Sequence, residues 1–161
     1  MTRTSKTPAL PQRSGDRPRT GPEIPHQQLT QNAPLSLQEE LWHRMISLDG
    51  VHPGRSYVSL PDTRALHLDP QLARGPRDAF FLGTEFAHLH GTSDGSLHLM
   101  LPVSVASDAI AKGWSELHPV ARRGAAQPTL VMLYGPRDEA ELETVWQLVL
   151  TSYAFARGEA G

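Results

Sequence analysis

The chain has no cysteine among its 161 residues. Disulfides, thiolate nucleophiles and cysteine-ligated zinc are therefore excluded. Long apolar runs are also missing: no stretch approaches the roughly 20 residues of a membrane-spanning helix. The N-terminus lacks the apolar core of a signal peptide. We therefore expect a cytoplasmic protein that does not bind membranes.

Strong charge of either sign is absent as well, because the formal net charge is −2 at pH 7. A basic surface that would capture nucleic acid or an anionic membrane is thus not expected. The sequence contains no phosphate-binding loop, no glycine-rich dinucleotide turn, no nucleophile elbow and no His-Glu-x-x-His motif. These absences exclude several large classes of enzyme.

The composition divides the chain into two parts. Residues 1–34 are rich in proline, arginine, threonine and glutamine, and we interpret them as a flexible or extended N-terminal arm. Within this arm the first dozen residues are predicted to be unstructured, and Arg17–Leu29 to lie on the domain. Residues 35–157 are predicted to form one α+β domain, a mainly antiparallel sheet with helices packed on one face.

Local signals place the main elements of this domain. Ser36 and Glu39 match a capping box at the start of a helix that Gly50 would end. A second helix is expected between Pro102 and Lys112, and a last long helix after Asp138. The region 114–127 is interpreted as irregular. Strands are expected over residues 51–60, 64–68, 85–90, 96–101 and 129–134.

Three histidines fall on a predicted β-hairpin. Side chains alternate between the two faces of a strand, so the apolar residues of this hairpin define its core face, and His88, His90 and His98 share the other face. If residues 90 and 96 close the turn, His88 lies opposite His98 with Cβ atoms about 5 Å apart. The pattern predicts a cluster of imidazoles on one side of the sheet.

Such a cluster suits proton transfer or metal binding. His88, His90 and His98 supply three nitrogen ligands, enough for a zinc or non-haem iron ion with open positions. Strand alternation places Glu85 on the opposite face, which weakens a site of two histidines and one carboxylate. The structural alternative is that these imidazoles only hydrogen-bond the backbone or one another.

Other candidates lie outside the hairpin. His118 lies in a loop, where a scaffold often carries functional residues. Arg137 follows a strand end, where it could clamp an anionic ligand group, although pairing with glutamates of its own helix is the simpler interpretation. Phe86, Trp114 and Tyr134 are candidate substrate-binding walls, and Trp114 is equally suited to anchor a helix end in the core.

Several short motifs in order resemble the fungal luciferase family. The similarity covers roughly residues 84–155, with weaker echoes at Arg17-Pro18 and His26-Gln27-Gln28. The motifs are Glu85-x-Ala87-His88-x-His90, Leu97-His98-Leu99-x-Leu101, Lys112-Gly113-Trp114, His118-Pro119 and Leu133-Tyr134-x-Pro136-Arg137.

The resemblance implies an activity. Fungal luciferase oxidises 3-hydroxyhispidin, a styryl 2-pyrone, with molecular oxygen, and an endoperoxide-like intermediate loses carbon dioxide to leave an excited product. The family is generally regarded as needing no added organic cofactor. Residues 91–95 and 120–128 differ from the fungal pattern, and no membrane-anchoring helix is expected here. These departures predict a soluble relative with another substrate. The family shares positions His88, His90, His98, His118, Tyr134 and Arg137.

Two functional hypotheses follow. In the first, the chain is an oxygenase without an organic cofactor, acting with O2 on an enolic, hydroxypyrone-like or other aromatic small molecule. Its catalytic residues would be His88, His90, His98, His118 and Arg137. In the second, the same pocket belongs to a non-catalytic binding module. A homo-oligomer, or a partner held by the arm, is a further expectation.

Overall fold

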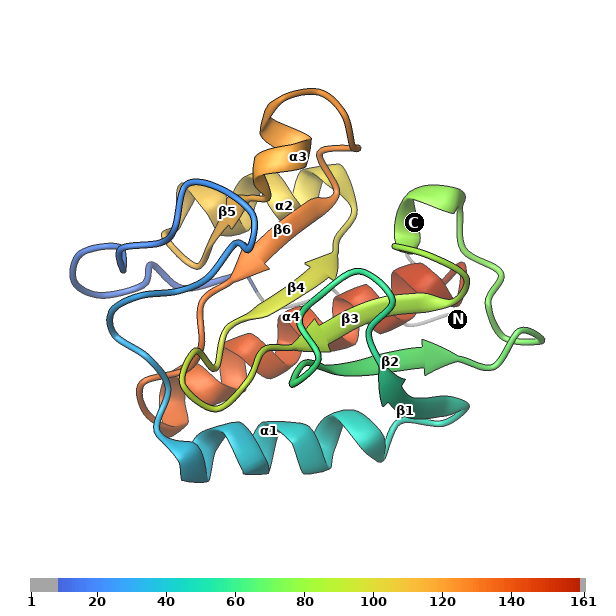
Figure 1. Cartoon of the computed structure of the whole chain (residues 1–161), viewed down its shortest axis with the longest axis horizontal. Coiled ribbons are helices and arrows are strands. Elements are labelled where there is room, and N and C mark those ends of the chain that lie inside the picture. The colour runs from blue at the N-terminus through green and yellow to red at the C-terminus, as the bar shows by residue number, and fades with distance from the viewer. Residues whose placement is uncertain (1–8, 160–161) are drawn as a thin grey trace, which may run out of the picture.

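A six-stranded antiparallel sheet organises the chain, of which the computed structural model describes residues 9–159 (Figure 1). The strands lie in the order β1-β2-β3-β4-β6-β5, and each neighbouring pair is antiparallel. This architecture confirms the predicted α+β class. The strands are β1 (Val51–Arg55), β2 (Arg64–Leu68), β3 (Glu85–Leu89), β4 (Leu97–Met100), β5 (Ser115–Leu117) and β6 (Leu130–Leu133).

Helices cover one face of this sheet. They are α1 (Leu35–Ile46), α2 (Val103–Ala111) and α4 (Glu139–Ala156); the chain also forms the short helix α3 (Pro119–Arg122) and a 3₁₀ turn η1 (Arg77–Ala79). Helix α4 passes behind β3 and β4 in Figure 1, and α1 contacts both α4 and β1. No helix within residues 9–159 has both the length and the apolarity to cross a membrane.

The hydrophobic core lies between the sheet and these helices. It uses the apolar positions that strand alternation predicts, and fully burying each leucine or valine contributes about 1.5–3 kcal/mol. The central side chains, all fully buried, are Leu41, Met45, Leu66, Leu89, Leu97, Leu99, Val131, Leu133, Val145 and Val149.

The opposite face is covered by the N-terminal arm. The Arg17 guanidinium donates to the Ser115 carbonyl at 2.8 Å, and the Gly135 amide donates to the Gln28 side chain at 3.0 Å. Figure 1 shows this blue segment against β5 and β6. The predicted lack of structure over the first dozen residues falls mostly outside the described residues. It is wrong for Pro11 and Gln12, whose groups bond Trp114 and Lys112.

The β3–β4 hairpin has the predicted register. His88 is paired with His98, and the His90 amide donates to the Ser96 carbonyl at 2.9 Å, which closes the turn. The histidines of the hairpin therefore share one face of the sheet, as the alternation pattern predicts.

A β-bulge at Phe86 changes this alternation at the start of β3. Leu66 pairs with Ala87, but the next residue, His67, pairs with Glu85, so Phe86 has no partner on β2. One extra residue reverses the facing of what precedes it. Glu85 consequently lies on the histidine face, and the prediction that it would point away from His88 is wrong.

Other predicted boundaries shift by a few residues. Pro34 occupies the N-cap of α1, and no side chain caps that helix, so the capping box at Ser36 does not form. The first strand ends at Arg55 because residues 56 and 57 turn towards Glu85. The region 114–127, predicted to be irregular, contains β5 and α3.

Candidate functional site

Five imidazoles gather on the sheet face that is opposite the helices. His88 lies on β3, His90 directly follows that strand, and His98 lies on β4. The arm supplies His26, and His118 precedes α3. His98 is central: its ring centroid lies 4.4 to 5.2 Å from those of the other four. All are buried except the half-buried His118.

Glu85 holds the outer nitrogen of His88, which is Nδ1, the ring nitrogen that does not face His98. This Nδ1 lies 2.8 Å from a Glu85 carboxylate oxygen, which also accepts from the Ser56 hydroxyl at 2.9 Å. The Tyr57 amide donates to the second oxygen at 3.0 Å. Burial by itself would raise the pKa of Glu85, but these hydrogen bonds, His88 first, bring that pKa below its ordinary value. Glu85 is therefore an ionised acceptor.

The outer nitrogen of His90 is backed by a second carboxylate through a serine. His90 Nδ1 lies 2.8 Å from the Ser96 hydroxyl, and that hydroxyl donates to Asp94. The Gln28 backbone N–H donates to the other Asp94 oxygen at 3.2 Å. Burial opposes ionisation of Asp94, yet the bonds from His90 and Ser96 lower its pKa overall. The turn of the hairpin thus orients His90.

His98 is linked to a third carboxylate through His26. The His98 Nε2 lies 2.9 Å from His26 Nδ1, and His26 Nε2 lies 2.9 Å from Glu116. Glu116 also accepts from the Tyr134 hydroxyl at 2.8 Å. Burial, together with the neighbouring carboxylate, raises the pKa of Tyr134 to about 12, so the phenol stays protonated as a donor.

His118 has a different hydrogen-bonding role. Its Nδ1 accepts the Val120 backbone N–H at 3.1 Å as the N-cap of α3. A neutral imidazole that accepts at Nδ1 carries its proton on Nε2. Burial, followed by repulsion from the other histidines, lowers the pKa of His118 to about 4, which keeps the ring neutral. His118 is therefore a fixed N–H donor.

Burial also keeps the inner histidines neutral. Desolvation is the main cause that lowers the pKa of His88, and it lowers that of His98 further, because the surrounding imidazoles disfavour a positive charge there. Neutral imidazoles backed by ionised carboxylates have defined tautomers, since each nitrogen beside an anionic oxygen must carry a proton.

All five histidines line a cavity of about 1010 Å³. This is at the upper end of the range for small-molecule sites. Its mouth is apolar: Ile24, Val58 and Leu82 are 62%, 52% and 55% exposed. Arg77, Asp62 and Asp78 line the same cavity and give it charges of both signs. The cavity joins an apolar entrance to a histidine-lined interior. The apolar walls deeper in include Phe80, Phe81, Met100, Val120 and Leu130.

Comparison with known proteins identifies related chains. The sequence model of the luciferase-domain family matches residues 83–152. The luciferases of Armillaria mellea and Armillaria ostoyae are 30% and 29% identical over 92% of this chain and 61% of their own length. The chain belongs to the fungal luciferase family. The luciferase of Neonothopanus nambi is 36% identical over 44% of the chain and 27% of its own length. No solved structure matches.

Within this luciferase-family fold, four of the predicted site residues converge. His88, His90, His98 and His118 meet at one cavity, and the arm adds His26 to them. The chain spans about three fifths of the length of the Armillaria luciferases, 61%. The other predicted site residues, Phe86, Trp114, Tyr134 and Arg137, do not line the cavity.

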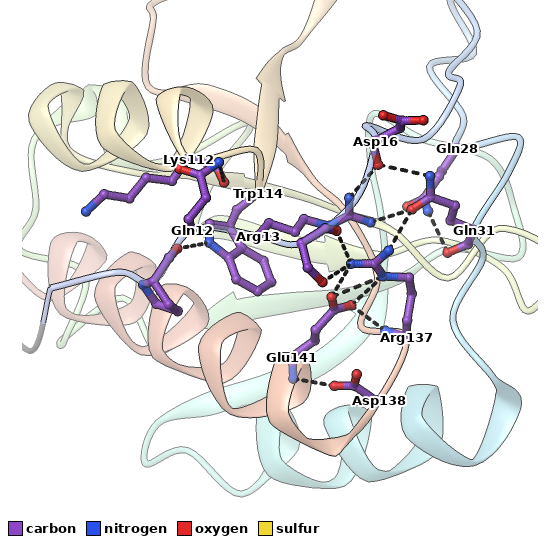
Figure 2. Close-up of polar contacts among 12 residues, drawn as sticks. Gln12, Arg13, Asp16, Gln28, Gln31, Lys112, Trp114, Arg137, Asp138 and Glu141 are labelled. Carbon is purple, nitrogen blue, oxygen red and sulfur yellow. Dashed lines mark hydrogen bonds and ion pairs between the residues drawn. The ribbon is translucent and has the colours of Figure 1, made fainter.

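Phe86 and Trp114 were predicted as walls of the cleft, but both pack in the core. The bulge turns Phe86 to the helix side of the sheet, where its ring lies 6.1 Å from that of Tyr153 on α4. Trp114 is 4% exposed, and its indole N–H donates to the Pro11 carbonyl at 2.7 Å. Trp114 thus anchors the arm, as Figure 2 shows.

Tyr134 and Arg137 also hold structure together outside the cavity. The buried Tyr134 supports Glu116, as described above, and the Arg13 guanidinium lies 5.4 Å above its ring. Arg137, which precedes α4, is paired with Glu141 in the first turn of that helix rather than with a ligand (Figure 2). It also donates to the Ser14 carbonyl at 2.7 Å and to Gln31 at 3.2 Å. Arg137 therefore clamps the arm to α4.

We expect Arg137→Ala to loosen this clamp. The substitution leaves Glu141 without its cation and the Ser14 carbonyl without its donor, so the free energy of unfolding should fall by about 1–3 kcal/mol. Chemical denaturation at pH 7 measures the loss, and hydrogen exchange should accelerate over residues 13–16.

The pH dependence of that loss has a defined sign. Burial opposes ionisation of Glu141, but Arg137 lowers its pKa overall. A carboxyl whose pKa is lower in the folded state stabilises the protein above the unfolded pKa of about 4.3, and this contribution disappears as the pH falls. The difference between wild type and Arg137→Ala should therefore shrink below about pH 4. A difference that is constant down to pH 3 contradicts an ionic clamp.

Sequence reasoning missed several residues of the site. Glu85 was excluded by an alternation that the bulge breaks, and Glu116 lies on a strand that was not predicted. Asp94 was regarded only as part of a turn. His26 belongs to the arm, where the weak family echo at His26-Gln27-Gln28 was the one available signal.

Proposed function

We propose that this chain is an oxygenase that reacts an enolic, hydroxypyrone-like or other aromatic small molecule with O2. The observation that supports this most is the convergence of five imidazoles in one cavity of about 1010 Å³. The relatives named luciferases support the same class of chemistry. The apolar entrance suits a flat, weakly polar substrate better than a sugar or a phosphorylated metabolite.

The histidines on the hairpin supply the base. His88 Nδ1 carries the proton that Glu85 accepts, so His88 Nε2 holds a lone pair towards the interior of the site. This lone pair can take the proton of a bound enol, and Glu85 then stabilises the imidazolium that forms. Glu85 positions His88 and is not itself the base.

His118 is suited to stabilise the negative charge that develops on the substrate oxygen. Its Nε2–H is fixed by the bond at Nδ1, and the ring lines the cavity. A hydrogen-bond donor held at the position of an enolate oxygen stabilises the anion without reorganisation. The enolate carbon then donates an electron pair to O2, a carbon–oxygen bond forms, and the proton held by the histidine passes to the new peroxide oxygen. The substrate is oxidised and O2 is reduced to the peroxide level.

Oxygen uptake tests this proposal. Purified protein is mixed with a panel of hydroxypyrones and other enolisable aromatics, and we expect one O2 to be consumed per substrate, with ¹⁸O2 labelling the product. Fluorescence titration of the same compounds measures binding separately. Binding without oxygen uptake above the buffer rate would reject the oxygenase and favour a non-catalytic small-molecule binding module in the same cavity.

A further inference from the structure

The inner nitrogens of three histidines, those on the side of His98 Nδ1, face one another at short range. His98 Nδ1 lies 3.2 Å from His88 Nε2 and 3.0 Å from His90 Nε2. The ligand atoms of these three residues all lie within 4.8 Å of one another, and all three rings are buried. Which of these nitrogens carry protons decides what the centre of the cluster can hold.

The outer hydrogen bonds determine the tautomers. His88 Nδ1 must donate to the carboxylate of Glu85, so its Nε2 is a lone pair. The Ser96 hydroxyl gives its proton to Asp94, so it accepts from His90 Nδ1, and His90 Nε2 is a lone pair as well. Two of the three inner nitrogens are therefore acceptors.

The same reasoning reaches His98 through the arm. His26 Nε2 must donate to Glu116, which leaves His26 Nδ1 as an acceptor for the His98 Nε2–H. His98 Nδ1 consequently carries the third lone pair. When each ring carries only the proton that its outer hydrogen bond uses, no proton is left for a bond between two inner nitrogens, and the three lone pairs repel one another unless a cation lies between them.

We propose that His88 Nε2, His90 Nε2 and His98 Nδ1 bind one divalent first-row transition-metal ion of the Zn²⁺ or Fe²⁺ type. Nitrogens bound at about 2.0–2.1 Å in a tetrahedral shell lie roughly 3.3 Å apart, close to the two separations found here. Three imidazoles and no thiolate suit these ions and leave an open coordination position. A proton would bridge one nitrogen pair, whereas a metal ion accepts all three lone pairs.

The surroundings match those of metal-binding histidines. Ligating histidines usually give their second N–H to a carboxylate, which orients the ring. Here Glu85, Asp94 and Glu116 stand behind the three ligands, the first directly and the others through Ser96 and His26. Three negative charges outside a neutral ligand set favour a dication at the centre. Because the three ligands line the cavity, an anionic ligand oxygen could fill the open position.

A second group of nitrogens, on His26, His98 and His118, is equally close together but has the wrong protonation. His98 Nε2 carries the proton given to His26, and His118 Nε2 carries a proton because Nδ1 accepts from Val120. Only His26 Nδ1 offers a lone pair there. The tautomers therefore assign the metal to the hairpin set.

Metal titration of the untagged full chain tests the assignment without any organic substrate. After treatment with a chelator, Co²⁺ is added and its visible absorption is followed, and zinc is measured by calorimetry. We expect one ion per chain, the absorption of low-coordinate Co²⁺, and a rise of several degrees in the thermal midpoint. His90→Gln should weaken binding at least about 100-fold, and Glu85→Gln about 10–100-fold.

Two variants serve as comparisons. His43→Gln changes an exposed histidine on α1 and should bind metal as the wild type does. His118→Gln should also retain metal affinity, because His118 is not a ligand. Circular dichroism checks the fold of each variant, and Glu85→Gln keeps the test decisive if His90→Gln unfolds.

Three results would overturn the assignment: no stoichiometric binding by the wild type, equal affinity in His90→Gln, or loss of affinity in His118→Gln but not in His90→Gln. The metal site does not rest on the oxygenase proposal, and the two make competing use of His88 Nε2, because a bound metal ion would occupy the lone pair of the proposed base. Stoichiometric binding without oxygen uptake would retain the metal centre and reject the oxygenase, and oxygen uptake without stoichiometric metal binding would do the reverse.

Discussion

Replacing His98 with alanine is expected to lower kcat for oxygen uptake by about 10²–10⁴-fold, the range for removal of a general acid or base. His98 contacts the other four imidazoles, so its loss removes the ring that positions His88, the proposed base, beside His90 and His118. The dissociation constant of a non-oxidisable substrate analogue should change much less, because apolar walls contribute most of the binding. Oxygen-electrode kinetics and fluorescence titration measure the two quantities.

His43→Ala is the matched control, since it removes an exposed imidazole from α1. It should leave both kcat and the dissociation constant unchanged. A thermal melt of His98→Ala shows whether the variant is folded. A folded His98→Ala protein with the kcat of the wild type would contradict a catalytic histidine cluster, whatever the effect on binding.

Phe86→Ala should produce the largest loss of stability. The ring is fully buried at the bulge and packs against α4, and truncating such a side chain costs about 3–5 kcal/mol. Chemical denaturation measures this loss. Phe86→Leu keeps most of the volume and should cost less than about 1.5 kcal/mol.

The same pair of variants tests on which face of the sheet Phe86 lies. At a temperature where the alanine variant is still folded, its affinity for a cavity ligand should equal that of the wild type, because Phe86 faces the helices. Unchanged stability with weakened ligand binding would return Phe86 to the cavity wall and argue against the bulge.

The bulge also bears on how the site is assembled. Without the extra residue, Glu85 would enter the core, where an unpaired carboxylate is costly. With it, Glu85 meets His88 and is satisfied by Ser56 and Tyr57 from the loop that follows β1. Bulges are frequent next to functional sites because they re-aim a single side chain.

Much of the fold was predictable because it follows local rules. Alternating leucines gave the register and the core face of the hairpin, and Pro102 and Asp138 marked helix starts to within one residue. Elements were not predicted correctly where their sequence signals were short or conflicted with one another. The three residues of β5 are too few for a pattern, and Pro34 displaced the capping box that Ser36 and Glu39 suggested.

The sequence by itself determined that His88, His90 and His98 share a face, because strand periodicity is a local property. Only the tertiary structure decided what surrounds them. His26 and Glu116 are 90 residues apart in the chain and meet only when the arm crosses the sheet. Arg137 and Trp114 carry residue types that suit a binding site, but partners distant in sequence use them to hold the arm. A residue's type and its neighbours in sequence limit which contacts it can make, and packing of remote segments selects among them.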